Sequence, residues 1–280
     1  MTGKGKSLMR SAAAAPHVVW SVLFIVAPLL FVCYYAFTDA GGSFTFENIA
    51  GLGNYANTFG LSVAFAFIAT VICLVICYPL AYFICQLSDG SQKVLVMLAM
   101  LPMWMNLLIR TYSMMAILDN EGFLNKFFEA VGIGHVKILG TPGAVIFGMV
   151  YNFLPYMLLP IYSIMSKLDV RLIEAAQDLG CNQWQVITKV IFPLSVPGVI
   201  SGVTMVFVPS ISTFYISQKL GGGTFDLIGD AIERQFSLNR DYNTGAAISL
   251  VMMILILISI AVMNHFTDGD TENGVGGMIV

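Results

Sequence analysis

Long apolar runs separated by short polar stretches dominate the chain. The runs cover residues 17–37, 61–87, 94–118, 143–166, 195–217 and 244–266. Each is long enough for a helix to cross the hydrocarbon core of a bilayer, which takes about 20 residues. No small-residue cleavage site follows the first run, so we expect a first transmembrane helix and not a removed signal. The pattern predicts an all-α integral membrane protein with six transmembrane helices.

The polar interval between the fourth and fifth runs has an apolar rhythm of its own. Its first part repeats apolar residues at spacings of three and four, which places them on one helix face: Leu172, Ile173, Ala176 and Leu179. Asp169 is placed to cap the start of this helix and Gly180 to end it. The interval therefore predicts a surface helix that begins and ends within the loop.

A second helix is predicted to follow directly. Asn182 opens it, with Gln185 three residues later in a capping-box relation. Four residues are expected along its inner side: Trp184, Ile187, Val190 and Ile191. Together the two segments predict a helix-turn-helix on the membrane surface.

An ordered set of residues in this interval resembles a known motif. It consists of Glu174, Ala175, Ala176, Gly180, Val190, Phe192 and Pro193. The order is similar to the EAA loop of the membrane subunits of ATP-binding-cassette (ABC) importers, with Val190 and Phe192 where that family usually has Ile and Leu. In that family the loop docks on a cytoplasmic ATPase. The resemblance thus implies a coupling loop at 167–194 with these docking residues: Glu174, Ala175, Ala176, Asp178 and Gly180. The alternative is a helix that lies on lipid headgroups.

Composition supports the membrane assignment and argues against other classes. Hydrophobic residues make up 58% of the chain and charged residues only 10%, against roughly one quarter charged in soluble domains. A net charge of −3 without a basic cluster gives no indication of nucleic-acid binding. The five cysteines are expected to be small buried hydrophobes. We expect neither a catalytic site nor a metal site, because no nucleophile, ligand cluster or carboxylate pair stands out.

The distribution of basic residues predicts the orientation. The tail before the first span carries Lys4, Lys6 and Arg10, whereas residues 38–60 carry no Lys or Arg. The positive-inside rule then places the N-terminus in the cytoplasm, and six spans return the C-terminus to the same side. The expected organisation is a cytoplasmic tail at 1–16, a first span and outer loop at 17–60, a transmembrane core at 61–266 and a second cytoplasmic tail at 267–280.

Several spans contain polar and aromatic residues that an inert anchor does not need. In the third run, Asn106 and Arg110 are four residues apart and are expected on one face of a helix. Arg110 is interpreted either as a group beside a transport path or as a structural cation. Pro155 and Pro160 are expected to kink the fourth helix. The candidate path residues are Asn106, Arg110, Tyr151, Asn152, Phe214 and Tyr215.

Four further stretches resemble one permease of the bacterial spermidine/putrescine uptake system. They are residues 101–115, 166–180, 214–223 and 227–236, and the likeness extends from the first span to the sixth. The resemblance implies a type I ABC importer permease fold in the cell membrane. It also implies a heterodimer with a second permease, two copies of a cytoplasmic ATPase and an external polyamine-binding protein. ATP and Mg²⁺ would then be bound by the ATPase, so no cofactor and no enzymatic activity are expected here.

The residues themselves restrict how a polycation would be recognised. None of the six runs contains Asp or Glu, so recognition is expected to depend on the binding protein, on carboxylates of the second permease or on aromatic faces. Cation–π contacts of about 0.5–2 kcal/mol would ease passage without trapping the solute. Other importer substrates remain open, such as opines, sulfate or ferric ion. An ion-coupled secondary transporter and a membrane enzyme are weaker alternatives.

Overall fold

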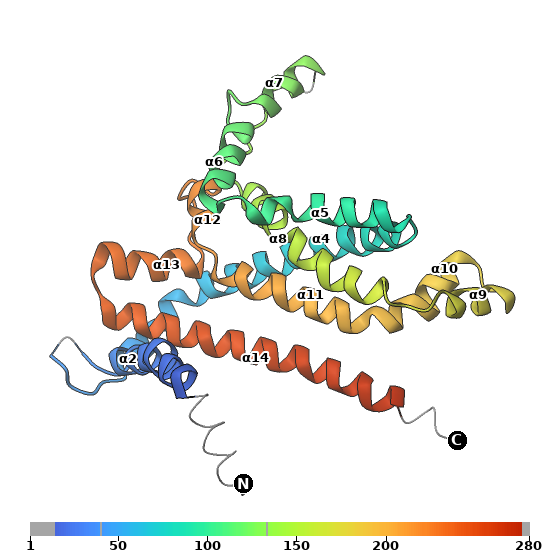
Figure 1. Cartoon of the computed structure of the whole chain (residues 1–280). Helices are drawn as coiled ribbons and strands as arrows, with labels where there is room; N and C mark the ends of the chain where they lie inside the picture. The colour runs from blue at the N-terminus through green and yellow to red at the C-terminus, as the bar shows by residue number, and fades with distance from the viewer. Residues whose placement is uncertain (1–14, 40, 133, 276–280) are drawn as a thin grey trace, which may run out of the picture. The chain divides into compact units, whose positions relative to one another are not determined.

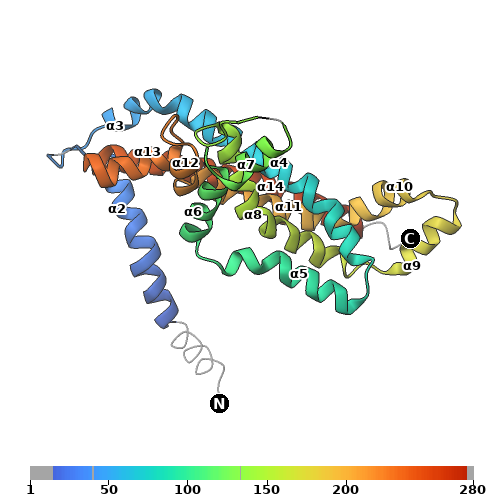
Figure 2. The same ribbon diagram turned by 90° about the horizontal axis from the view of Figure 1, so that it is seen from above.

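The computed structural model describes residues 15–39, 41–132 and 134–275, and this part of the chain is almost entirely helical (Figures 1 and 2). Basic residues of the predicted N-terminal tail, Lys4, Lys6 and Arg10, lie outside the described residues. The backbone of the last helix continues to Val275, into the predicted C-terminal tail. Residues 276–280 lie outside the description.

The helices follow one another with short connections. In chain order they are η1 (Val22–Val26), α2 (Ala27–Ala36), α3 (Glu47–Ala50), η2 (Gly51–Tyr55), α4 (Ala56–Cys85), α5 (Asp89–Trp104), α6 (Leu107–Leu118), α7 (Phe123–Ala130), α8 (Pro142–Met165), α9 (Val170–Asp178), α10 (Gln183–Val186), η3 (Ile187–Ile191), α11 (Phe192–Ser212), α12 (Tyr215–Leu220), α13 (Ile228–Arg234), η4 (Gln235–Asn239) and α14 (Tyr242–Val275). The helix α8 runs on through Pro155 and Pro160.

Five helical segments of the described chain are long and apolar enough to cross a membrane. They are Ala15–Ala36, Glu47–Cys85, Pro142–Met165, Gln183–Ser212 and Tyr242–His265. A sixth crossing is formed if the bent pair Asp89–Trp104 and Leu107–Ala130 counts as one span. The predicted all-α fold is confirmed, and its six spans agree with the structure when the bent pair is counted.

The apolar run over 94–118, which was expected to form one span, is divided between two helices. The helices α5 and α6 meet at 95°, because Met105 and Asn106 adopt extended backbone conformations. Pro102 lacks the amide hydrogen that would continue the α5 hydrogen bonds. The Asn106 side chain then accepts a hydrogen bond from the Leu108 amide at 2.8 Å and starts α6 as its N-cap.

The predicted fifth span over 195–217 also ends earlier than expected. Helix α11 stops at Ser212, and Thr213 is extended. The chain then re-enters a helix at Tyr215. Phe214 therefore lies in a break between two helices. Tyr215 begins the second helix and does not lie inside one long span.

The chain divides into two compact units. The first contains Met1–Ala56 and Ala231–Ile254. In it the end of α2 packs against the start of α14 through Ala36, Ala246, Ala247 and Leu250. The Gln235 side-chain amide donates to the Tyr55 hydroxyl at 2.7 Å.

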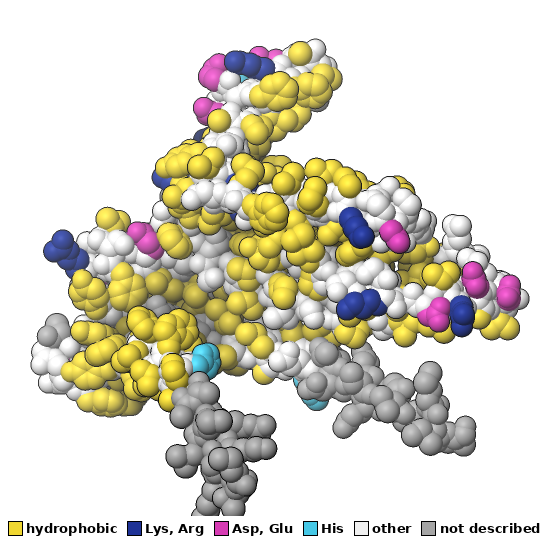
Figure 3. All heavy atoms as spheres, viewed as in Figure 1, with side chains coloured by type: hydrophobic (Ala, Val, Ile, Leu, Met, Phe, Trp, Pro, Cys, Tyr) yellow, Lys and Arg dark blue, Asp and Glu magenta, His cyan; other side chains and the backbone are white. Residues whose placement is uncertain are grey.

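The second unit contains Asn57–Asp230 and Leu255–Val280, and its core lies between α4, α8 and α11. The thiols of Cys73 and Cys77 are buried against the Val150 and Leu154 carbonyls of α8, as predicted. The other three cysteines are only partly buried: Cys33, Cys85 and Cys181. Figures 1 and 2 both show α9 and α10 beyond the ends of α8 and α11. In Figure 3 charged side chains gather at α9 and at α7, with a largely hydrophobic surface between them.

Candidate coupling loop and substrate path

Helix α9 has both ends closed by local hydrogen bonds. At its start the Asp169 carboxylate accepts from the Arg171 amide at 3.0 Å. At its end the Gly180 amide donates to the Gln177 carbonyl at 2.8 Å and the Cys181 amide to the Ala176 carbonyl at 3.0 Å. Gly180 has a φ of +83°, so this is a Schellman motif with glycine in the left-handed conformation. The predicted start and end of the helix are confirmed.

The second helix of the loop begins with the predicted capping box. The Gln185 amide donates to the Asn182 side-chain oxygen at 2.9 Å, and the Asn182 amide donates to the Gln185 side chain at 2.9 Å. The predicted inner side is wrong at Trp184, which is 72% exposed, whereas Val186 and Ile191 are buried. Trp184 lies in α10, before the π-helical segment η3 that contains Ile191.

The exposed surface of α9 carries most of the predicted coupling residues. Glu174, Ala175, Asp178 and Gly180 are exposed, whereas Ala176 is buried. Of the four apolar residues that the sequence places on one face, Ala176 is buried, whereas Leu172 and Leu179 are 48% and 86% exposed. Acidic groups, a small alanine and a large exposed leucine thus share a surface that another protein could cover.

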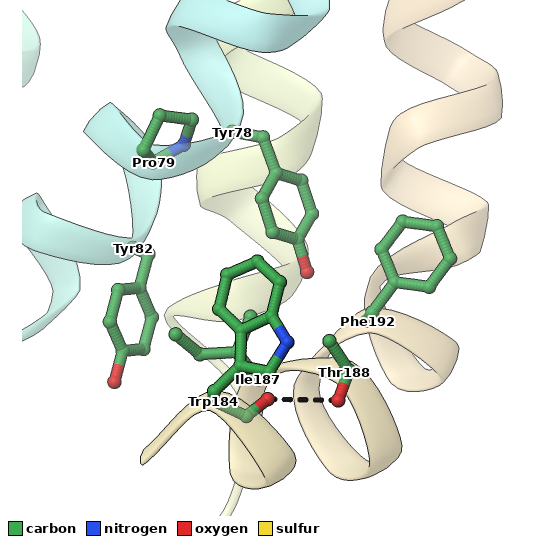
Figure 4. A pocket seen from close by; sticks show the side chains of 7 residues that line it. All are labelled: Tyr78, Pro79, Tyr82, Trp184, Ile187, Thr188 and Phe192. Carbon is green, nitrogen blue, oxygen red and sulfur yellow. Dashed lines mark hydrogen bonds between the residues drawn. The ribbon is translucent and has the colours of Figure 1, made fainter.

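An aromatic pocket of about 500 Å³ lies beside this loop (Figure 4). Its lining comes from α4 (Tyr78, Pro79 and Tyr82), from α10 and η3 (Trp184, Ile187 and Thr188) and from Phe192 of α11. Figure 4 shows the side chains of α4 and of the coupling loop facing each other across this space. The Tyr78 hydroxyl is 3.0 Å from the Ser195 hydroxyl. Sequence analysis missed the pocket, although Tyr78 and Tyr82 have the spacing of one helix face.

Arg110 lies at the joint between α5 and α6 and is 7% exposed. Its Nη1 donates to the Pro102 carbonyl at 2.6 Å, and its guanidinium carbon lies 6.0 Å from the centroid of the Tyr151 ring. Its Nε is buried without a hydrogen-bond partner. Asn106 caps α6, so the expectation that Asn106 and Arg110 share a face of one continuous helix is wrong. In the structure the Arg110 guanidinium instead lies at the break between α5 and α6.

Arg110 and Tyr151 line one small hollow of about 180 Å³, together with Met105, Ser113, Met114, Ile117, Leu118 and Phe147. Asn152 is buried, and its amide nitrogen donates to the Gly148 carbonyl at 2.7 Å. Its side-chain oxygen has no partner. Two of the candidate path residues, Arg110 and Tyr151, thus line the same hollow, whereas Asn152 is not among its lining residues.

A second cluster forms where α6 contacts α12. The rings of Tyr112 and Tyr215 are 6.2 Å apart and nearly perpendicular, at 82°. The Lys219 ammonium lies 5.4 Å from the Tyr112 centroid and 5.8 Å from the Tyr215 centroid. Phe214 precedes this cluster and is 42% exposed. Sequence analysis missed Tyr112 and Lys219, because helices far apart in the chain bring them together.

The apolar spans define a helical integral membrane protein with a capped surface helix between two of its spans. Residues 87–269 match the family described as "Binding-protein-dependent transport system inner membrane component". The chain belongs to this family, and it is a multi-pass permease of the inner membrane.

Curated relatives cover most of the chain. It is 39% identical over 253 residues to the spermidine/putrescine transport system permease protein PotB of Haemophilus influenzae, covering 87% of this chain and 88% of the relative. It is 37% identical over 249 residues to the Escherichia coli protein of the same name, with 85% and 90% covered. Among solved structures, a chain of a bacterial alginate ABC transporter in complex with an alginate pentasaccharide-bound periplasmic protein matches with a TM-score of 0.77. That match has 17% identity and covers 94% of this chain and 95% of the other. This last likeness shows the ABC importer permease fold.

Proposed function

We propose that the chain is one of two permeases in an ATP-driven importer of polyamines such as spermidine and putrescine. The observation that carries this proposal is the similarity to spermidine/putrescine permeases over most of the chain. The capped helix α9 supports it, because a permease without its own nucleotide site needs a firm contact with a separate ATPase. Opines, sulfate and ferric ion are the alternative cargoes.

The loop between α8 and α11 would make the contact with the ATPase. Its exposed residues form the proposed docking surface: Glu174, Ala175, Asp178, Leu179 and Gly180. Both termini would lie on the same cytoplasmic side. A second permease would complete the path and an external binding protein would deliver the cargo. ATP and Mg²⁺ would be held by the ATPase.

Aromatic faces would guide the cation through this subunit. Aromatic rings lie at two places along α6. Tyr151 of α8 lies beside Arg110, and Tyr215 of α12 lies beside Tyr112. A fixed guanidinium repels a polycation, so the Tyr112 and Tyr215 rings, with Phe214 next to them, are the stronger candidates for contact. Carboxylates that neutralise the cargo would come from the second permease.

Reconstitution tests the proposal directly. The chain is assembled in proteoliposomes with its second permease, ATPase and binding protein, and uptake of radiolabelled spermidine, putrescine and sulfate is measured with and without ATP. We expect ATP-dependent uptake of polyamines and none of sulfate. Uptake without ATP, or ATP-dependent uptake of sulfate alone, would overturn the proposal.

A further inference from the structure

The Lys219 ammonium already occupies an aromatic site. Tyr215 and Lys219 are one turn apart on α12, and Tyr112 comes from α6. The two rings stand at 82° to each other, and the ammonium lies within 6 Å of both centroids, at 5.4 and 5.8 Å. Both distances lie within the range of a cation–π contact. Tyr112 is 51% exposed, so this chain itself does not cover the site.

The chemistry of this occupant matches that of the proposed cargo. A lysine side chain is a primary ammonium on a chain of four methylene groups. Putrescine is a chain of four methylene groups with a primary ammonium at each end, and spermidine contains the same unit. Rings that hold the Lys219 side chain therefore present the geometry that one end of a polyamine requires.

We propose that Tyr112 and Tyr215 form a binding site for the terminal ammonium of a polyamine, and that Lys219 fills this site as a tethered substitute until the cargo displaces it. This inference rests on the proposed function, because it takes a polyamine as the cargo. It adds a site and a competition that the similarity to relatives does not supply.

The tether sets the strength of the competition. A group on a short flexible link has an effective concentration in the millimolar range. Weak cations then fail to displace it, whereas a polyamine delivered at high local concentration succeeds. When the cargo moves on, Lys219 returns and the site does not retain the next cation for long. Binding of the cargo at this site is therefore brief.

A spectroscopic experiment follows the lysine itself. The assembled transporter is reductively methylated with ¹³C-formaldehyde, and the Lys219 signal is assigned by its loss in Lys219→Arg. We expect this signal to be shifted upfield by the two rings and to return toward the value of free dimethyllysine when putrescine is added. The same concentration of 1,4-butanediol, which has the carbon chain without charges, should leave it unmoved. An unshifted signal, or a signal that ignores putrescine, would overturn the inference.

A binding experiment measures the competition. Radiolabelled spermidine is equilibrated with the transporter in nanodiscs without binding protein. Lys219→Met keeps an unbranched side chain and removes the charge, and it should lower the Kd about 2- to 5-fold, the range of an exposed cation–π contact. Adding Tyr112→Leu and Tyr215→Leu should abolish this gain. Lys126→Met removes an exposed outer-loop charge and should change nothing.

The two proposals fail in different ways. If the wild-type complex takes up no polyamine with ATP, the proposed function fails. If the wild type transports polyamine while Lys219→Met binds it no more tightly, only the tethered-lysine site fails.

Discussion

Arg110 is a cation held inside a span by backbone and aromatic groups. The Pro102 carbonyl lies at the end of α5, where the helix dipole is negative, and it also accepts a hydrogen bond from the Met105 amide at 3.3 Å. The Arg110 Nη1 donates to it from the next helix at 2.6 Å. The side chain therefore joins α5 to α6 across the break, which favours the structural interpretation of this residue.

Replacing Arg110 should separate the two helices. Arg110→Met keeps much of the bulk but removes a charge-assisted hydrogen bond, and we expect the free energy of unfolding to fall by about 1.5–3 kcal/mol. Thermal unfolding of the purified complex measures the loss, with Lys189→Met, an exposed charge removal, as control. An unchanged unfolding temperature in Arg110→Met would contradict the joining role.

Gly180 combines a left-handed backbone conformation with open space. Its φ is +83°, and a Cβ built there meets no atom within 4 Å. Gly180→Asp should therefore cost this chain only about 1–2 kcal/mol of backbone strain, while the added carboxylate projects at the proposed ATPase contact. We expect ATP hydrolysis to continue but uptake to be lost.

Gly132 offers a matched control for this variant. It has a φ of +84° and equally open space, but it lies after α7, far along the chain from the loop. Gly132→Asp brings the same strain and charge and should leave coupling intact. Parallel measurements of ATPase rate and uptake decide the matter: normal coupling in Gly180→Asp, or equal loss in both variants, contradicts a docking role for Gly180.

At the scale of elements, the contact of α8 with α11 depends on two glycines four residues apart. A Cβ on Gly198 would lie 2.9 Å from the Pro160 carbonyl oxygen, and one on Gly202 would lie 2.8 Å from the Met157 sulfur. Small residues at this spacing let membrane helices approach closely. The pattern is legible in the sequence as Gly-x-x-x-Gly, although our sequence analysis did not use it.

A larger residue at Gly198 should force these helices apart. The obstacle is backbone, which cannot rotate away, so Gly198→Val should abolish stable assembly with the second permease and ATPase. Gly60→Val is the control, because nothing lies within 4 Å of its Cβ on α4. Co-purification of the subunits measures the effect; normal recovery of the Gly198→Val complex would show that α8 and α11 tolerate separation.

Local signals account for what the sequence predicts well. Asp169, Gly180 and the Asn182–Gln185 pair set the helix ends through hydrogen bonds to their own neighbours. The break at Met105 was missed because the apolar pattern continues through it. The exposure of Trp184 was missed because an apolar pattern does not report which side chains other elements cover. Tyr112 meets Lys219 only through tertiary packing, which no local pattern reports.

At the scale of the whole molecule, the distribution of charge indicates which parts of the second unit meet water. Charged side chains gather at α9 and at α7 (Figure 3), and the spans between carry few. Membrane proteins keep charges out of the hydrocarbon region because burying them there is costly. The coupling loop and the α7 region are therefore expected on opposite sides of the membrane.

Labelling in intact cells tests this orientation. Glu174→Cys and Lys126→Cys each place a thiol at an exposed position, in a background where Cys181 is alanine. A membrane-impermeant maleimide should label Lys126→Cys from outside, and should label Glu174→Cys only after the cells are opened. Labelling of Glu174→Cys from outside would reverse the topology and remove the ATPase from its proposed side.

The capping of both ends of α9 bears on how an importer permease could come to pair with a different ATPase. Hydrogen bonds within residues 169–181 close both ends of α9, while Ala176 and Ile173 pack against the core of the unit. Because the ends are set locally and the exposed face is separate from the packed one, this segment transplanted from a relative should keep its bounds and bring with it that relative's preference for an ATPase. A permease could then change its ATPase by exchanging about a dozen residues of this loop, while its transmembrane helices stay the same.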